Sequence, residues 1–439
     1  MIFKINTFKG GVHPREFKEL SDNQAFEIMP VSKEIILPLQ QHLGKEAAPV
    51  VKKKDRILAG QLVAEAVGFI SAPVHSPVTG TVKDIKSVAT SIGFPKKSII
   101  ITPEESDENK FLEPMDIDSV TPEQIVERVK VAGIVGMDGA SFPTYVKLIP
   151  QKDKPIDTLI INACECEPYF TRDYRIMMER PMQFISGIKL IIKALKVKKA
   201  IIGIEDNKPQ AIEILKQHIA NEETIKLEVL RTKYPQGAEK MLIHASIKRQ
   251  FSPGKLPLDF GVVVQNVVTA LLVYEAVVEG KPQIEAILTV SGKGIKTPKN
   301  LIVKIGTPLK DILDYCGGIS DDTVKLVVGG LMMGNTVYDL KTPLMKATSG
   351  ILFLTQSEVN DTKEQNCVRC GNCVEVCPVN LYPTKLARLS RYTKYKDALN
   401  MGIMNCMECG TCQYNCPSNV PLVHWLKLGK SKAKNIQVA

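Results

Sequence analysis

The sequence has few of the features that mark membrane-spanning or nucleic-acid-binding proteins. It has one tryptophan and no run of about eighteen or more apolar residues, so we expect no transmembrane segment. Its most apolar stretch, 261–280, is interrupted by polar residues and predicts a buried strand and a helix. No signal peptide is visible at the N-terminus, which argues against disulfides, and the cysteine-rich end of the chain favours a reducing cytoplasm. The net charge of +10 comes without a nucleic-acid-binding motif, and we expect no nucleic-acid partner.

Side chains arranged for acid, base or nucleophilic catalysis are also lacking. None of the six histidines stands in a pattern that indicates a catalytic constellation, and we interpret them as structural. No general acid or nucleophile is evident either. We therefore predict no catalytic side chain, so that any reaction would depend on bound cofactors.

Cysteine, in contrast, is concentrated near the end of the chain. Eight of the 11 cysteines lie in two runs, NCVRCGNCVEVCP and NCMECGTCQYNCP, which share the spacing C-x2-C-x2-C-x3-C-P. Ferredoxins that carry a pair of [4Fe–4S] clusters have this spacing, and the fourth cysteine of each run binds the other cluster. The predicted ligand sets are Cys367, Cys370, Cys373 and Cys416 for one cluster, and Cys406, Cys409, Cys412 and Cys377 for the other.

Zinc or disulfides are the alternatives for these cysteines. Zinc sites use paired C-x2-C units with four ligands in all, and neither run is built in that way. Gly371 and Gly410 favour clusters, because glycine lets the backbone turn close against a cofactor. The three remaining cysteines have no evident ligand set and are interpreted as unligated thiols: Cys164, Cys166 and Cys316.

The first part of the chain, residues 1–105, predicts a small β domain. Short apolar runs alternate there with glycine and proline, which is typical of a sandwich or barrel. The segment resembles barrel-sandwich domains of the lipoyl and biotinyl type. The tip of the expected turn reads SPVTGTV and has no lysine to carry a prosthetic group, so we expect a structural role.

The rest of the chain predicts a multidomain α/β protein. TPEQ at Thr121 is a helix start with a capping box. After it, strands and helices alternate, which predicts a parallel, Rossmann-like α/β domain over 115–280. Residues 281–355 predict a β-grasp domain, and 361–430 a helical, ferredoxin-like domain with two clusters. The basic tail KLGKSKAKN could contact a membrane or partner, or be disordered.

Two segments of the α/β region have the composition of ligand-binding loops. GIVGMDGASFPTYVKL places Gly136 and Gly139 near Lys147, which is suited to an anion, although it is neither a Walker loop nor a G-x-G-x-x-G motif. A strand then ends in NACECEPYFTRDY, where parallel sheets bind ligands. Its polar residues could hold ribose hydroxyls or a flavin edge, or could form a solvated loop: Asn162, Glu165, Glu167 and Asp173.

Four motifs in these loops resemble a known family. The sequence is similar to the FMN- and NADH-binding flavoprotein subunit of respiratory complex I at GMDGASFPTYVK, NACECEP, YPQGAEK and QNVVT, in the same order. Its N-terminal GGVHP, its β-grasp pattern and its two cysteine runs narrow the resemblance. Together they resemble the C subunits of the Rnf complex, a membrane-associated ferredoxin:NAD oxidoreductase.

The resemblance implies cofactor contacts at individual positions. The implied FMN contacts are Gly136, Gly139, Lys147, Asn162, Glu165, Tyr234, Gly237, Asn266 and Thr269. The implied NAD(H) contacts are Glu167 and Glu239, with Phe142 as a stacking surface for adenine. The loop departs from the complex I pattern at Met137, which replaces an arginine, and at Asp138 and Ser141, which replace glycines. Cys164 replaces an aspartate, so that contact is not carried over.

The resemblance also implies a function. We expect a peripheral subunit on the cytoplasmic side of the cell membrane, which exchanges electrons between NAD(H), FMN and two [4Fe–4S] clusters. Partner subunits would link it to ferredoxin. One alternative is a soluble relative, such as a cobalamin reductase, which passes electrons to a corrinoid. The other is a non-catalytic scaffold whose α/β domain has lost its cofactors, an interpretation that Asp138 and the missing arginine favour.

Overall fold

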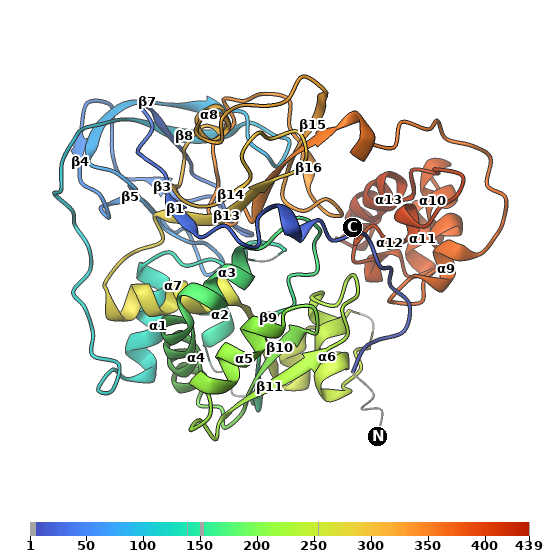
Figure 1. Cartoon of the computed structure of the whole chain (residues 1–439), viewed down its shortest axis with the longest axis horizontal. Coiled ribbons are helices and arrows are strands. Elements are labelled where there is room, and N and C mark those ends of the chain that lie inside the picture. The colour runs from blue at the N-terminus through green and yellow to red at the C-terminus, as the bar shows by residue number, and fades with distance from the viewer. Residues whose placement is uncertain (1–5, 138, 150–152, 253, 439) are drawn as a thin grey trace.

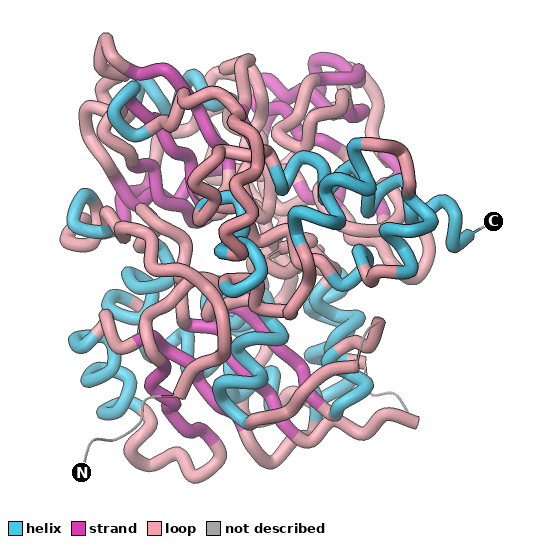
Figure 2. Tube along the Cα trace, turned by 90° about the vertical axis from the view of Figure 1, so that its right-hand side faces the viewer, coloured by secondary structure: helices cyan, strands magenta, loops and turns pink. Residues whose placement is uncertain are grey.

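The computed structural model describes residues 6–137, 139–149, 153–252 and 254–438. A β-rich part, coloured blue and orange in Figure 1, lies above a green α/β part, and a red helical domain lies beside both. Seen from the side, the C-terminal helices form a group of their own (Figure 2). The predicted fold class, a multidomain α/β protein with these four kinds of domain, is confirmed by the family comparisons given below.

The N-terminal β domain consists of two small sheets that contribute to one apolar core. One sheet has the strand order β2-β8-β7-β4 and the other the order β3-β5-β6. The strands are β2 (Ile35–Pro38), β3 (Ala48–Pro49), β4 (Arg56–Ile57), β5 (Leu62–Glu65), β6 (Val74–His75), β7 (Gly80–Val88) and β8 (Lys96–Pro103). Residues from this domain and from the β-grasp domain bury their apolar side chains in one shared core, for example Leu37, Ile99, Leu288 and Val303.

The β-grasp domain is built on a mixed sheet with the order β1-β14-β13-β17-β15-β16. Its first strand, β1 (Phe26–Ile28), comes from the N-terminal part of the chain and pairs in parallel with β14. The other elements are β13 (Glu285–Ser291), β14 (Lys299–Lys304), α8 (Leu309–Tyr315), β15 (Thr323–Val328), β16 (Asn335–Thr336), β17 (Gly350–Thr355) and the 3-10 turn η3 (Gln356–Glu358). This pairing ties the start of the chain to residues about 270 positions later.

The α/β domain has a four-stranded, fully parallel sheet in the order β11-β10-β9-β12. Its strands are β9 (Thr158–Ala163), β10 (Ala200–Glu205), β11 (Ile225–Leu230) and β12 (Val262–Asn266). The helices and 3-10 turn are α1 (Pro122–Val131), α2 (Thr144–Leu148), α3 (Arg172–Glu179), α4 (Pro181–Leu195), α5 (Pro209–His218), α6 (Glu239–Ile247), η2 (Pro257–Phe260) and α7 (Val267–Val278). Helices cover both faces, and the strands β9, β10 and β12 are buried along their whole length. The predicted capping box at Thr121 is present.

The C-terminal domain is helical and has an internal repeat. Its elements are α9 (Asn372–Glu375), α10 (Pro383–Arg391), α11 (Tyr395–Asn400), η4 (Ile403–Asn405), α12 (Thr411–Tyr414) and α13 (Leu422–Val438). The two cysteine runs have the same backbone shape, since Gly371 and Gly410 both have positive φ, 84° and 86°. The basic tail is part of helix α13, so the alternative of a disordered tail is wrong.

The N-terminal segment, residues 6–20, connects the three parts of the molecule. It forms β-bridges from Asn6 to Leu230 and from Val12 to Tyr234 at the edge of the α/β sheet. The amide of Gly11 donates to the carbonyl of Val376, in the first cysteine run. The segment ends in the 3-10 turn η1 (Lys18–Leu20). No helix within the described residues has both the length and the apolar character needed to cross a bilayer.

Candidate functional site

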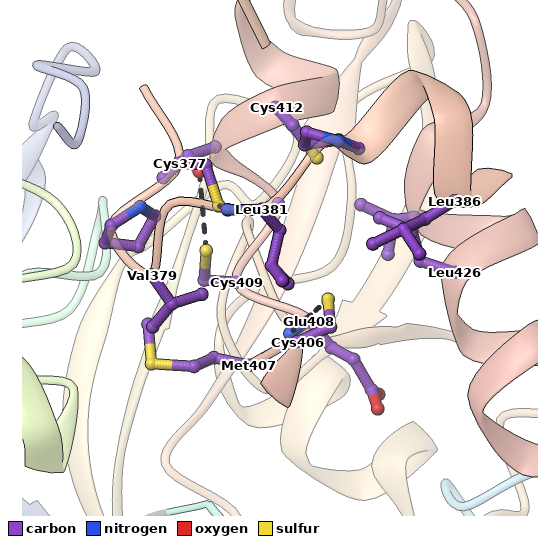
Figure 3. Close-up of a pocket in the computed structure, with 15 residues that line it drawn as sticks. Cys377, Val379, Leu381, Leu386, Cys406, Met407, Glu408, Cys409, Cys412 and Leu426 are labelled. Atoms are coloured by element: carbon purple, nitrogen blue, oxygen red, sulfur yellow. Dashed lines mark hydrogen bonds between the residues drawn. The ribbon is translucent and has the colours of Figure 1, made fainter. Parts of the chain in front are cut away.

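One predicted set of cluster ligands surrounds a cavity. Cys377, Cys406, Cys409 and Cys412 all line this cavity in the C-terminal domain (Figure 3). The backbone amide of Leu381 donates to the sulfur of Cys377 at 3.3 Å, and in the other run the amide of Glu408 donates to the sulfur of Cys406. Such N–H···S hydrogen bonds tune iron–sulfur clusters. The four thiols predicted to hold one cluster, from two separate runs, are thus gathered around one cavity.

The second predicted set lies nearer the surface. Cys367 and Cys370 are exposed, Cys416 is half-buried and Cys373 is buried. The chain around the first two is also exposed, from residue 360 to residue 371. The two sets thus differ in their access to solvent, although their cysteine spacing is the same.

The carboxyl edge of the parallel sheet gathers the predicted flavin residues. Asn162 and Asn266 are register partners on the neighbouring strands β9 and β12. The amide of Asn162 donates to the carbonyl of Gly237 at 2.8 Å, which brings the YPQG loop to the strand end. The amide of Asn266 donates to a carboxylate oxygen of Asp173 at 2.7 Å. Ligands bind at this edge in open α/β sheets, so these residues could hold part of a cofactor.

The predicted glycine loop lies beside this edge. The hydroxyl of Thr269 accepts from the amide of Met137 at 3.1 Å, and the amide of Gly136 donates to the carbonyl of Phe142 at 2.8 Å. Gly139 is exposed with φ +51°, and no atom lies within 4 Å of the position a Cβ would occupy. That open backbone fits a nucleotide phosphate. Asp138 lies outside the described residues.

Two residues predicted for different cofactors form an ion pair. Lys147 of α2 donates to the carboxylate of Glu239 at 3.4 Å and to the carbonyl of Val264 at 3.2 Å. The sequence predicts Lys147 as an FMN contact and Glu239 as an NAD(H) contact. Phe142 is half-buried and packs against the apolar core of the α/β domain. The ammonium group of Lys147 is thus held by Glu239 and by the carbonyl of Val264 in the middle of β12, two residues before Asn266.

The two glutamates of the NACECEP loop make defined hydrogen bonds. The carboxylate of Glu165 accepts from the amides of Asp173 and Tyr174, at the start of helix α3. The carboxylate of Glu167 accepts from the amide of Met332, at 3.1 Å, in the β-grasp domain. Burial raises the pKa of both glutamates to about 7. The loop therefore joins two domains through its acidic side chains.

A lysine that the sequence reasoning missed holds this loop in place. The ammonium of Lys18 donates to the carbonyl oxygens of Glu165, Glu167 and Phe170, at 2.8, 3.1 and 2.7 Å. Lys18 lies about 150 positions earlier in the chain, in a segment without a recognised motif, so no local pattern could reveal it. It also lines a polar cavity at the sheet edge together with Glu167 and Tyr234.

Tyr234 links the α/β domain to the iron–sulfur domain. It is buried, and its hydroxyl donates to the carbonyl of Cys409 at 2.8 Å. Both residues belong to one apolar cluster, which also includes Val12, Cys166 and Met332. The predicted flavin loop is therefore in direct contact with the cysteine run that lines the cavity.

Comparison with known families agrees with this arrangement. Residues 129–275 match the Nuo51 FMN-binding domain, and residues 6–106 match the RnfC barrel sandwich hybrid domain. Residues 287–336 match the SLBB domain, and residues 361–420 match the 4Fe-4S dicluster domain. The predictions of an FMN-binding domain and of a two-cluster domain are confirmed, and zinc and disulfides are excluded for the cysteine runs.

Relatives match over nearly the whole chain. The C subunit of the proton-translocating ferredoxin:NAD(+) oxidoreductase complex of Clostridium ljungdahlii is 43% identical over 90% of this chain and 86% of its own length. The C subunit of the ion-translocating oxidoreductase complex of Rhodobacter capsulatus is 43% identical, over 98% and 84%. The C subunit of the Na(+)-translocating ferredoxin:NAD(+) oxidoreductase complex of Acetobacterium woodii is 40% identical, over 89% of each chain.

A solved structure supports the fold alone. It is an NAD+-reducing [NiFe]-hydrogenase, with a TM-score of 0.52 and 19% identity over 72% of this chain and 66% of its own.

An FMN-binding α/β domain in contact with a two-cluster domain defines an electron-transfer flavoprotein subunit. More narrowly, the chain belongs to the RnfC family, the C subunits of Rnf-type ion-translocating oxidoreductase complexes.

Proposed function

We propose that this chain is the subunit at which NAD(H) exchanges electrons with an Rnf-type complex. Partner subunits at the membrane would link it to ferredoxin, and the chain itself would bind peripherally to them. When bound, FMN exchanges two electrons with NAD(H) and single electrons with iron–sulfur clusters, which is chemistry that amino acid side chains do not supply. The contact between Tyr234 and Cys409 carries the proposal, because it joins the flavin-type pocket to a cluster cavity.

The residues at the sheet edge would bind and orient FMN. Asn162 and Asn266 offer amide groups from adjacent strand ends, and the open backbone at Gly139 offers room for the phosphate. Lys147 would offset the phosphate charge, with Glu239 keeping its ammonium group in position. Glu167, which lies between the sheet edge and the β-grasp domain, would contact NAD(H). Together these residues give the pocket donors on one side and carboxylates on the other.

The burial of the cysteines supports an order for the two clusters. The set that includes Cys409 lies against the flavin loop, and its cavity is enclosed by the C-terminal domain. The set that includes Cys367 and Cys370 is exposed, so it is the one a partner could approach. Residues 361–439 contain eleven basic and five acidic side chains, which supports an acidic surface on that partner. The first set would therefore face the flavin and the second the rest of the complex.

The test uses the full chain, purified anaerobically with its iron–sulfur clusters reconstituted. Any flavin is extracted and identified, NADH is then added, and the visible spectrum is followed. FMN release together with bleaching of flavin and cluster absorbance is the expected result. Clusters that stay oxidised with NADH, even after FMN is supplied, would rule out the proposal and favour a non-catalytic scaffold.

A second measurement separates the proposal from the soluble reductase. The chain is expressed in its native host cells, which supply the partner subunits. Its distribution between the membrane and soluble fractions is then compared before and after a high-salt wash. A peripheral subunit is expected in the membrane fraction and in the salt wash, because it is held by polar contacts with partner subunits. Recovery in the soluble fraction alone would favour a relative that passes electrons to a soluble acceptor.

A further inference from the structure

Arg172 is a buried arginine with one unused hydrogen-bonding nitrogen. It is the first residue of helix α3 and is 4% exposed. Its Nε donates to Asp173 at 2.9 Å, and its Nη2 donates to the carbonyl of Met137 at 2.8 Å. The third nitrogen, Nη1, is buried and has no hydrogen-bond partner among the described residues. Since a buried, charged donor without a partner is costly, Nη1 is suited to an acceptor beyond the described residues, such as a bound ligand.

The surroundings of Arg172 place it at the proposed flavin pocket. Met137, whose carbonyl it holds, lies in the glycine loop next to Gly136. Asp173, its ion-pair partner, accepts from the amide of Asn266, and its own backbone amide donates to Glu165. Through Asp173 and Met137, Arg172 is thus linked to three residues predicted to contact FMN, namely Glu165, Asn266 and Thr269. None of these contacts uses Nη1.

The glycine loop around Met137 contains no positively charged side chain. Met137 stands where the similar loop of complex I has an arginine, so this loop has no cation of its own. Lys147 lies nearby but shares its ammonium with Glu239 and the carbonyl of Val264. Arg172 comes from a different segment, and its guanidinium reaches the backbone of the same loop.

We propose that Arg172 binds the flavin nucleotide and replaces the arginine missing from the glycine loop. Its Nη1 would donate a charge-assisted hydrogen bond to a negatively charged group of FMN. That group is either the phosphate or the N1–C2=O edge of the ring, which becomes anionic on reduction. The inference rests on the proposed FMN site and adds a residue to it. Binding of an oxyanion by a planar guanidinium fork is the chemistry for which arginine is best suited.

The alternative is that Arg172 only fastens the loop to helix α3. Two variants separate charge from structure. Arg172→Lys keeps the positive charge, and Arg172→Gln keeps an amide donor for the carbonyl of Met137 without the charge. The matched control is Arg128→Gln, because Arg128 is also buried and its Nη1 donates to a backbone carbonyl, that of Ala276. Ala276 lies near the C-terminal end of α7, whereas the glycine loop contacts Thr269 near the N-terminal end.

The experiment measures flavin binding to the full chain after its flavin has been removed and its clusters reconstituted. FMN and riboflavin are titrated separately, with quenching of flavin fluorescence as the readout. Arg172→Gln is expected to raise the Kd for FMN about tenfold or more, and Arg172→Lys less than about threefold. Arg128→Gln is expected to bind FMN like the unmodified chain. Thermal unfolding of each variant is measured alongside.

Riboflavin and the midpoint potential of the bound flavin distinguish the two anionic groups. If Nη1 binds the phosphate, Arg172→Gln weakens the binding of FMN but not of riboflavin, so the preference for FMN falls about tenfold while Lys147 remains, and the potential stays the same. If Nη1 binds the ring edge, both flavins bind more weakly to the same degree. The midpoint potential then falls, because the reduced, anionic ring loses the cation that stabilised it. Either pattern supports the inference.

Two results would overturn the inference and leave the FMN site intact. In the first, Arg172→Gln binds both flavins with unchanged Kd and potential. In the second, Arg172→Lys is folded but binds FMN as weakly as Arg172→Gln, so that charge is not what matters. An unmodified chain that binds no FMN would overturn the inference together with the proposed function.

Discussion

The hydroxyl of Tyr234 donates to the carbonyl of Cys409, at 2.8 Å, across the boundary between the α/β domain and the iron–sulfur domain. Tyr234 is 2% exposed, so this hydrogen bond is formed away from water. The bond lies between the loop that meets the flavin-type pocket and the cysteine run that lines the cluster cavity. It is therefore a direct structural link between the two proposed cofactor sites.

Removal of this hydroxyl is expected to loosen the contact between the two domains. Tyr234→Phe keeps the ring in its apolar cluster and loses one hydrogen bond, worth about 1 kcal/mol, or about fivefold in the equilibrium constant for docking of the two domains. Bleaching of the clusters by NADH, followed by stopped-flow absorbance, should slow by up to that factor. FMN affinity should stay the same, because the hydroxyl is bonded to the carbonyl of Cys409. Tyr315→Phe, which removes a hydroxyl bonded to Glu27 in the β-grasp sheet, is the control. An unchanged bleaching rate in Tyr234→Phe would show that the bond does not hold the domains together.

Lys18 is expected to be needed for both stability and flavin binding. Lys18→Met removes a donor to three carbonyls of the NACECEP loop and should destabilise the fold by about 3 kcal/mol. The Kd for FMN should rise at least about tenfold, because the loop that carries Glu165 is no longer held. Thermal unfolding and FMN titration measure the two effects.

The control for this variant is Lys193→Met. Lys193 also donates to two carbonyls, those of Ile117 and Asp118. It lies in the last turn of helix α4, away from the carboxyl edge of the sheet. It should lower the stability and leave the Kd for FMN unchanged. If both variants weaken FMN binding equally, Lys18 acts only through global stability.

Local pattern was enough to predict the elements of the α/β domain. The alternation of strands and helices over 115–280 and the capping box at Thr121 are present, because apolar period and capping chemistry act within a few residues. The cysteine spacing is local as well, and it predicted the two-cluster domain. The candidate residues Asn162 and Asn266 could be named because they follow buried strands.

Contacts between distant parts of the chain could not be predicted in this way. Strand β1 pairs with β14, Lys18 reaches the loop after β9, and Arg172 reaches the carbonyl of Met137. Each depends on how whole domains pack, and none leaves a periodic or motif-like trace in the sequence. The missing arginine at Met137 was the one available signal, since it raised the question of which other cation serves that loop.

The pH dependence of stability should reflect Glu167. Burial raises the pKa of Glu167 from 4.5 to about 7, so between these values the folded protein retains a proton that the unfolded chain has lost. Stability from this group is fully present below pH 4.5 and is lost as the pH rises towards 7. Glu167→Gln should therefore flatten the dependence of the unfolding temperature on pH over this interval. Above pH 7 it should unfold about 2 °C higher than the unmodified chain.

The measurement is thermal unfolding from pH 4.5 to 8 at constant ionic strength. Glutamine can still accept from the amide of Met332, so the variant changes the titration and not the contact. Glu213→Gln, on the exposed face of helix α5, is the control and should leave the pH profile as it is. A Glu167→Gln profile parallel to that of the unmodified chain would mean that the carboxyl does not titrate in this range.

Single cysteine variants should separate the two clusters and their order. Cys406→Ser and Cys367→Ser each remove one ligand from one predicted set, and each should lower the iron content by about half. Cys316→Ser, a buried cysteine outside both runs, should leave the iron content unchanged.

The two cluster variants should differ in how fast NADH reduces the cluster that remains. In Cys367→Ser the remaining cluster lies next to Tyr234, so NADH should still reduce it once FMN is bound. In Cys406→Ser the remaining cluster is the exposed one, and its reduction by NADH should be at least about tenfold slower, while dithionite still reduces it. Low-temperature EPR of samples frozen after mixing with NADH shows which cluster has been reduced. Rapid reduction in Cys406→Ser would reverse the proposed order, because the exposed set would then be the one that communicates with the flavin.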